Sequence, residues 1–378
     1  MLTVGAFLVG AAWLYLILFR DGFWGDDHGL VITERGSDSK PSPVLQPSVV
    51  AIIPARNQAA VISASLNSLR RQDYLGALSI VVVDDQSSDG MGDVARALEP
   101  ERDPPLLVVQ GGPVRPGWAR RVWAMEQGVR RALEGSPDYL WFTEADVEHE
   151  PDVLRALVAR AEKDHLHLTS TEVIRVGRGA AGRWLVPASA FLLRTLHPLG
   201  LVSQSDSPLV GAAGSSMLVW TEALQDCGGL EMIHDHPLPA WGLAARIKPS
   251  GAIWWGLTTA SRSVRPLGVV DVWRSVAATA YTQLDYSRKR LALSLMVIAL
   301  LYVVPMAAVF WGALTADWTE AWAGVVAWTF LGVAYVPVLR NHGQGPAGAL
   351  LLPTAAALYW LMLLDSARRL KRGVRGTV

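Results

Sequence analysis

Two carboxylates that are one residue apart follow an apolar run near the middle of the chain. The run DYLWFT at residues 138–143 has the composition of a buried strand, and it leads directly into Glu144-Ala145-Asp146. Carboxylate oxygens are the ligands that Mg²⁺ or Mn²⁺ prefers, and such a cation can hold and neutralise a departing diphosphate. Triplets of this kind also occur by chance in loops, but the position at the end of a strand favours a metal site at Glu144 and Asp146.

A second acidic pair, Asp84-Asp85, ends the apolar run LSIVVVDD at residues 78–85. Carboxylates at a strand end can accept hydrogen bonds from a nucleobase or a ribose. Two adjacent carboxylates repel each other unless they share a partner, so a bound ligand explains Asp85 better than an ordinary turn does. For Asp89, in the QSSDG sequence that follows, capping of the next helix is an equally good explanation.

The histidines and the single cysteine are weaker candidates. His234-Asp235-His236 resembles a metal-binding run, but neighbouring side chains of an extended segment point to opposite sides. A loop carboxylate between two solvated imidazoles explains the run equally well. Cys227 has no second cysteine with which to form a disulfide or a thiolate metal site.

The segments around these residues alternate between strand and helix patterns. Four short apolar runs predict strands at residues 49–53, 78–85, 105–109 and 138–143. Helical patterns follow them, including a long one at residues 118–134. This alternation predicts an α/β domain with a mostly parallel sheet and helices on both faces. Ligands bind at the carboxyl ends of the strands in such sheets, and the two acidic pairs lie there.

Four other segments contain no charged residue and are close in length to the ~20 residues of a membrane-spanning helix. They lie at residues 3–19, 291–314, 321–339 and 347–364. A buried core helix is the alternative for any one of them, but four together favour a membrane protein. The first segment lacks the basic start and the cleavage site of a signal peptide, so it predicts a retained N-terminal anchor.

The placement of basic residues predicts how these segments are oriented. Arg20 and Arg288-Lys289-Arg290 flank the polar middle of the chain, so the positive-inside rule places that part in the cytoplasm, on a multi-pass protein of the inner (plasma) membrane. The basic tail at 365–378 disagrees with three full C-terminal spans, which leaves two or three spans open. Mixed polar and apolar faces at 183–202 and 272–287 predict interfacial helices, with ordinary core helices as the alternative.

Composition excludes two classes of protein. The chain has 378 residues with 34 Lys+Arg and 34 Asp+Glu, and 51% of its residues are hydrophobic. That hydrophobic content excludes intrinsic disorder. A chain with no excess of positive charge is a poor ligand for phosphate backbones, so we expect no nucleic-acid partner.

The motifs, taken together in order, resemble family 2 glycosyltransferases. They are PARN, VVVDDQSSDG, PGWARRVWAMEQG, WFTEADVEHEP, AAGSSML, a loop that begins with Gly-Gly, and TAYTQLDYS. More closely, the chain resembles hopene-associated (HpnB-like) membrane glycosyltransferases over nearly its whole length. The resemblance implies a GT-A fold that binds a nucleotide-sugar donor with a divalent cation, Mg²⁺ or Mn²⁺. It also implies transfer of the sugar to a lipid or other membrane-associated acceptor.

The resemblance also assigns roles to individual residues. It implies that the donor is bound by Pro54, Arg56, Asp84, Asp85, Arg120 and Glu144. Glu144 and Asp146 take the place of the metal and ribose motif, and Gly214 and Ser215 lie in the acceptor region. The division of the chain that follows is a transmembrane anchor at 1–20, a linker at 21–47, the GT-A domain at 48–262, an interfacial helix at 263–290, two or three transmembrane helices at 291–364 and a basic tail at 365–378.

The chain departs from the family pattern at several positions. Glu144 stands where an aspartate is usual, and Arg120 stands where a lysine is usual. Pro239-Ala240 replaces the acidic pair that activates the acceptor in similar proteins, and Asp285 replaces a basic residue. The donor half therefore resembles an active enzyme, whereas the acceptor half is altered.

Two functions are compatible with these departures. The first is an inverting, metal-dependent glycosyltransferase in which Asp235, a few residues before the expected acidic pair, is the general base, with His234 and His236 as alternative bases. The second is a membrane protein that keeps the fold and binds nucleotide but has lost transfer. Turnover of a nucleotide sugar, as opposed to binding without turnover, distinguishes the two.

Overall fold

The computed structural model describes residues 2–19, 29–30, 46–99 and 104–371. Arg20, most of the predicted linker and the end of the predicted basic tail lie outside the described residues. The chain divides into two compact units. We call residues 28–174 and 199–265 the α/β unit, and residues 1–27, 175–198 and 266–378 the helical unit.

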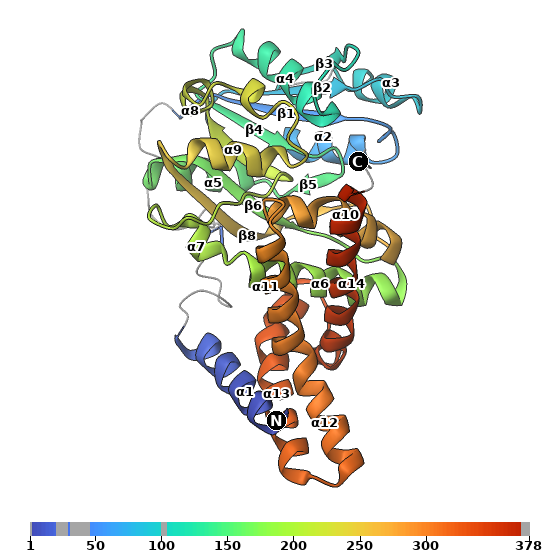
Figure 1. Ribbon diagram of the computed structural model, residues 1–378. Coiled ribbons are helices and arrows are strands. Elements are labelled where there is room, and N and C mark those ends of the chain that lie inside the picture. The colour runs from blue at the N-terminus through green and yellow to red at the C-terminus, as the bar shows by residue number, and fades with distance from the viewer. Residues whose placement is uncertain (1, 20–28, 31–45, 100–103, 372–378) are drawn as a thin grey trace, which may run out of the picture. The chain divides into compact units, whose positions relative to one another are not determined.

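An eight-stranded mixed sheet forms the centre of the α/β unit, with strand order β3-β2-β1-β4-β7-β6-β8-β5 (Figure 1). The strands are β1 (Val49–Ala55), β2 (Leu78–Asp84), β3 (Leu106–Gln110), β4 (Tyr139–Thr143), β5 (Val147–His149), β6 (Leu166–Ile174), β7 (Ser216–Trp220) and β8 (Ala252–Ser263). The first four are parallel to one another, as the alternating pattern predicts. Strand β7 then runs antiparallel to both β4 and β6, so the second half of the sheet is not parallel throughout.

The register of the parallel strands brings their carboxyl ends to one edge. Ala55, the last residue of β1, pairs with Asp84 at the end of β2, and Asp84 pairs with Gln110 at the end of β3. Strand β4 adjoins β1 on its other side. The loops that carry the predicted site residues therefore leave neighbouring strands of the sheet.

Both faces of the parallel strands are buried, which explains their continuous apolar sequences. Successive side chains alternate between two hydrophobic cores, so that Ile52 of β1 belongs to one core and Ile53 to the other. The Ile52 core includes α4 (Arg120–Leu133) and α9 (Pro239–Ile247). The Ile53 core includes α2 (Ile62–Arg70), the short α3 (Met91–Arg96) and α5 (Val153–Lys163).

Helix α4 approaches the sheet closely at a glycine. A Cβ atom on Gly128 would lie 2.5 Å from Ile52 Cγ2 and 3.2 Å from Val83 Cγ2. Both neighbours are β-branched side chains with little freedom to move. Gly128 therefore sets the distance between α4 and the sheet, and with it the position of the arginines in the first turn of α4.

The helical unit contains the apolar segments. Its helices are α1 (Leu2–Phe19), α6 (Gly179–Leu196), α10 (Val269–Gln283), α11 (Arg288–Ile298), α12 (Val304–Thr315), α13 (Trp318–Asn341) and α14 (Leu352–Lys371). Among the described residues, three continuous helical stretches are long and apolar enough to cross a membrane, at 288–315, 318–341 and 346–369. The apolar part of α1, residues 3–18, is shorter.

The two predicted interfacial segments, 183–202 and 272–287, both end earlier as helices in the structure, at Leu196 in α6 and at Gln283 in α10. The run at 183–202 is interrupted, because α6 ends at Leu196 and Pro198 cannot continue it; α7 (Leu199–Ser203) then belongs to the α/β unit. Phe191 of α6 is buried in the core of the helical unit, as in an ordinary core helix. Contact of α6 and α10 with a membrane stays a prediction.

We predict that Gly128→Ala lowers the free energy of unfolding by about 1–2 kcal/mol. Overpacking costs about 1–3 kcal/mol, and the better helix propensity of alanine returns up to about 1 kcal/mol. Gly135→Ala is the matched control, because Gly135 is exposed and its Cβ would meet its nearest neighbour at an ordinary 3.6 Å. Denaturant unfolding of the full-length protein, followed by tryptophan fluorescence, measures both, and equal effects would contradict the close approach.

Candidate active site

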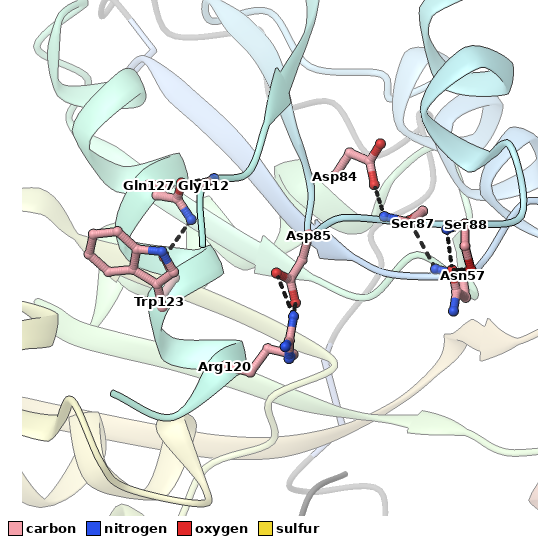
Figure 2. Close-up of polar contacts among 9 residues, drawn as sticks. All are labelled: Asn57, Asp84, Asp85, Ser87, Ser88, Gly112, Arg120, Trp123 and Gln127. Atoms are coloured by element: carbon pink, nitrogen blue, oxygen red, sulfur yellow. Dashed lines mark hydrogen bonds and ion pairs between the residues drawn. The ribbon is translucent and has the colours of Figure 1, made fainter. Parts of the chain in front are cut away.

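The loops that follow β1 and β2 are joined by hydrogen bonds (Figure 2). Asn57 Oδ1 accepts the backbone N–H of Ser88 at 2.8 Å, and the backbone N–H of Asn57 donates to Ser87 Oγ at 3.0 Å. Asn57 has a positive φ of 51°, a conformation that asparagine adopts more readily than most residues. This pairing holds the end of β1, with Pro54 in the strand and Arg56 directly after it, against the end of β2.

Asp84 and Asp85 have different surroundings. Asp84 Oδ1 accepts the backbone N–H of Ser87 at 3.0 Å. A Cβ atom on Gly92 would lie 2.2 Å from Asp84 Oδ2, so this carboxylate is packed against α3. These contacts show that the Asp84 side chain holds the loop after β2 in place. Its role in donor binding stays a prediction.

Asp85 forms an ion pair with Arg120 from the first turn of α4 (Figure 2). Arg120 Nη1 lies 3.2 Å from Asp85 Oδ1 and 3.3 Å from Oδ2. The side chain of Asp85 is 5% exposed, whereas that of Arg120 is 41% exposed. Burial raises the pKa of the Asp85 carboxyl, while the charges of Arg120 and Arg56 oppose that rise. The site thus pairs a buried carboxylate with a partly exposed cation.

The next arginine binds the next predicted carboxylate. Arg121 Nη2 lies 2.8 Å from Glu144 Oε1, and the Glu144 side chain is 18% exposed. Consecutive arginines of α4 therefore contact carboxylates from the ends of two different strands, β2 and β4. The resemblance assigns a role to Arg120 and none to Arg121, for which the only signal in the sequence is its position next to Arg120.

Asp146 has a partner on strand β8. Its side chain is buried, and Asp146 Oδ2 accepts a hydrogen bond from Ser263 Oγ at 2.7 Å. Over the part of the chain that the structure describes, no group of three or more His, Cys, Asp or Glu residues could hold a metal ion. Glu144 and Asp146 are nevertheless hard-oxygen donors, and one or two carboxylates are what Mg²⁺ needs when substrate phosphates supply further ligands. The donor set therefore fits a cation that binds together with a diphosphate.

The predicted acceptor region lies beside these residues. The backbone carbonyl of Ser215 accepts a hydrogen bond from Thr143 Oγ1, 3.0 Å away, and Thr143 directly precedes Glu144. A Cβ atom on Gly214 would lie 3.9 Å from Arg121 Nη2 and 3.5 Å from Ala240 Cβ. The structure thus brings Gly214, Ser215, Arg121 and Ala240 together.

Asp235 lies in a loop that contacts the start of α4. The loop connects a short helical turn, η2 (Leu230–Ile233), with α9. The carbonyl of His234 accepts the backbone N–H of Ala119 at 2.7 Å, one residue before Arg120. The side chain of Asp235 is exposed. Pro239 and Ala240, by contrast, are buried in the first turn of α9 and present no carboxylate there.

Comparisons with known proteins agree with this architecture. Residues 50–226 match the family model described as Glycosyl transferase family 2. No curated protein sequence matches the chain significantly.

Solved structures are similar at low sequence identity. The mannosyltransferase PcManGT from Pyrobaculum calidifontis, in complex with GDP-Man and Mn²⁺, has a TM-score of 0.50 and 20% identity, over 98% of this chain and 98% of that one. Glucosyl-3-phosphoglycerate synthase from Mycobacterium tuberculosis, in complex with Mn²⁺ and UDP-glucose, has a TM-score of 0.40 and 21% identity, over 63% of this chain and 79% of that one. The first similarity supports a GT-A fold.

The buried Asp85 carboxylate leads to a prediction about stability and pH. A carboxyl with a raised pKa binds more protons when the protein is folded than when it is unfolded, so its ionisation costs stability as the pH rises. We therefore predict that Asp85→Asn raises the melting temperature of the free protein at pH 7. The gain should shrink as the pH falls through the range in which Asp85 takes up its proton.

Asp84→Asn is the control for this measurement, because the Asp84 carboxylate already accepts a backbone N–H and should show no gain. Thermal unfolding of both variants and the wild type between pH 5 and 8 measures the effect. A lower melting temperature for Asp85→Asn at pH 7 would show that the ion pair with Arg120 outweighs the cost of burying the carboxylate.

Proposed function

We propose that the chain, whose residues 50–226 match the family 2 glycosyltransferase model, is a glycosyltransferase that moves a sugar from a nucleotide-sugar donor to a lipid or membrane-associated acceptor. The observation that carries the proposal is the arrangement of charges at the strand ends. Asp85 and Glu144 leave neighbouring regions of the sheet, and each is paired with one of two consecutive arginines. These ion pairs lie at the carboxyl ends of the strands, where sheets of this type bind ligands.

The donor half of the proposed reaction uses these charges. Glu144 and Asp146 would hold the divalent cation, Mg²⁺ or Mn²⁺, whose charge neutralises the leaving nucleoside diphosphate. Arg120 and Arg121 are partly exposed, so their guanidinium groups can also donate hydrogen bonds to diphosphate oxygens. Asp85, together with Pro54 and Arg56, would contact the nucleoside.

The acceptor half needs a base. In an inverting transfer, the acceptor oxygen forms a bond to the anomeric carbon while the bond from that carbon to the diphosphate breaks, and the acceptor hydroxyl loses its proton. Asp235 is our candidate for this base, because it is exposed and its loop contacts the start of α4 through His234. Gly214 and Ser215 would lie beside the acceptor.

A membrane-associated acceptor is supported by the helical unit. Large apolar side chains near the turn between α12 and α13 are exposed, with Trp318 66% and Trp322 65% exposed. The chain contains 16 tryptophans, and tryptophan is enriched at membrane interfaces. We propose a multi-pass protein of the inner (plasma) membrane with its α/β unit in the cytoplasm, because Arg288-Lys289-Arg290 forms the N-terminal end of the first long apolar helical stretch. The hopanoid link and the inverting stereochemistry rest on the resemblance described above.

One observation favours a second function, donor binding without transfer. Ala240 presents a methyl group next to Gly214, where similar proteins carry the acidic pair that activates the acceptor. A protein with an intact donor half and no base at that place could bind a nucleotide sugar and not release product. The two functions differ in turnover and not in binding.

We predict that Asp146→Asn abolishes stabilisation of the protein by Mn²⁺ plus a nucleotide sugar. Ligands that bind only the folded state raise its stability in proportion to RT ln(1 + [L]/Kd), so a thermal-shift screen with GDP-, UDP- and dTDP-sugars detects the donor. Asparagine preserves the acceptor for Ser263 Oγ, which alanine would remove. Glu148→Gln is the matched control, a neighbouring carboxylate paired with Arg262; equal shifts in both variants would contradict the metal assignment.

A second prediction concerns the base. Asp235→Asn should lower the transfer rate by about 10²–10⁴-fold, the usual contribution of general acid–base catalysis, and leave donor affinity nearly unchanged. Asp226→Asn, at an exposed position at the end of α8 (Thr221–Asp226), is the control. An unchanged rate in Asp235→Asn removes it as the base. Donor binding by the wild type with no transfer to a wide panel of acceptors would favour the second function.

A further inference from the structure

The segment that carries the predicted metal ligands is closed at its base by a hydrogen bond between two side chains. Strand β4 ends at Thr143, and strand β5 ends at His149, with Glu144 and Asp146 in between. Thr143 Oγ1 lies 2.8 Å from His149 Nε2, and both residues are buried. The two carboxylates therefore lie on a loop whose ends are joined.

The direction of this hydrogen bond follows from the neighbouring contacts. Thr143 has a single hydroxyl proton, and it donates that proton to the carbonyl of Ser215 at 3.0 Å. Thr143 Oγ1 must therefore accept from His149, so Nε2 of the imidazole carries a proton. His149 Nδ1, 2.8 Å from Ser261 Oγ, is then the acceptor for the Ser261 hydroxyl.

Burial keeps the imidazole in this single form. Burial lowers the pKa of His149 to about 3, so the ring is neutral at neutral pH. One tautomer then satisfies all the polar side-chain atoms of the network, from Ser261 through His149 and Thr143 to the Ser215 carbonyl. A fully satisfied buried network defines one arrangement of its members.

Further hydrogen bonds connect the same loop to helix α2 and strand β8. The backbone N–H of His149 donates to Ser68 Oγ at 3.1 Å, and Ser65 Oγ donates to the carbonyl of Glu144 at 3.3 Å. On β8, His149 pairs with Ser261, two residues from the Ser263 that contacts Asp146. The histidine is thus the one side chain of this network that links β8 to the end of β4.

We propose that His149, through its Nε2–H bond to Thr143, is a positioning residue that sets the placement of Glu144 and Asp146 for the metal-bound donor and of Ser215 for the acceptor. This inference rests on the proposed function. An ordinary buried histidine would contribute to stability alone, whereas here the network ends on both the metal-ligand loop and the acceptor region. Groups that orient metal ligands typically affect metal affinity by about 10–100-fold when they are changed.

Two substitutions separate positioning from stability. Glutamine at 149 can place an N–H near the position of Nε2, whereas asparagine, with its shorter side chain, can place an acceptor only near that of Nδ1. Both remove the ring and leave one end of the network unsatisfied. We expect His149→Asn to weaken Mn²⁺-dependent binding of the donor by about 10–100-fold and His149→Gln to weaken it by much less than tenfold.

The probe for this experiment is Mn²⁺ titrated in the presence of GDP-mannose or UDP-glucose, whichever gives the larger thermal shift with the wild type. Melting temperatures without ligand are measured in parallel. Equal losses of affinity in His149→Asn and His149→Gln, following equal losses of stability, would overturn the positioning role and leave a structural one.

The partner residue provides an independent test. Thr143→Val removes the hydroxyl at nearly constant volume and should reproduce the loss seen in His149→Asn, whereas Thr143→Ser retains the hydroxyl and should bind as the wild type does. If the two side chains act through one hydrogen bond, the double variant His149→Asn/Thr143→Val should lose no more affinity than either single variant. Additive losses would contradict a shared mechanism.

Hydrogen exchange tests the placement without any ligand. In His149→Asn, the backbone amides of residues 144–147 and 214–216 should exchange faster than in His149→Gln, while those of α5 stay unchanged. Unchanged exchange in both loops would overturn the inference even if donor binding is confirmed. If the wild type binds neither nucleotide sugar with Mn²⁺, the proposed function fails, and the exchange measurement alone decides whether His149 positions the loop.

Discussion

The pairing of two consecutive arginines with two carboxylates is the interaction on which the candidate site depends. Arg120 and Arg121 occupy the first turn of α4, where the helix dipole disfavours positive charge. Asp85 and Glu144, which are mostly buried at the ends of β2 and β4, each pair with one of these arginines and offset that cost. The arginines are more exposed than the carboxylates, which suits the proposed ligand, a diphosphate that binds together with a cation.

The position of α4 makes this pairing possible, and it is determined far from the charges. Gly128 allows α4 to lie close to β1, and the amide of Gln127 accepts the backbone N–H of Gly112 at 2.7 Å, which connects α4 to the loop after β3 (Figure 2). At the other end, the carbonyl of His234 holds the N–H of Ala119. The packing of α4 on the sheet and the loop between η2 and α9 thus both contact the same helix. Changes in either should shift the arginines that pair with Asp85 and Glu144.

Much of the α/β unit could be predicted from its sequence because buried parallel strands have continuous apolar runs with turn residues at their ends. The predicted long helix at 118–134 differs from the observed Arg120–Leu133 by only a few residues. Contacts between distant residues could not be predicted in this way. Ser263 and Asp146 are 117 residues apart and meet because β8 pairs with β5, an order that follows no sequence pattern. The hydrogen bonds of His149 could not be predicted from the sequence either, because its partners lie on three other segments.

In the proposed reaction, the alteration that the resemblance implies for the acceptor half lowers the rate and does not remove the chemistry. A general base typically contributes about 10²–10⁴-fold, whereas holding reactants in the correct geometry can contribute effective concentrations on the order of 10⁵–10⁸ M. In this chain the residues proposed to bind the donor and cation retain their partners, and the methyl group of Ala240 affects only the place next to Gly214. In the proposed reaction, a missing carboxylate at that place would remove the smaller of the two contributions, and the expected result is slow transfer.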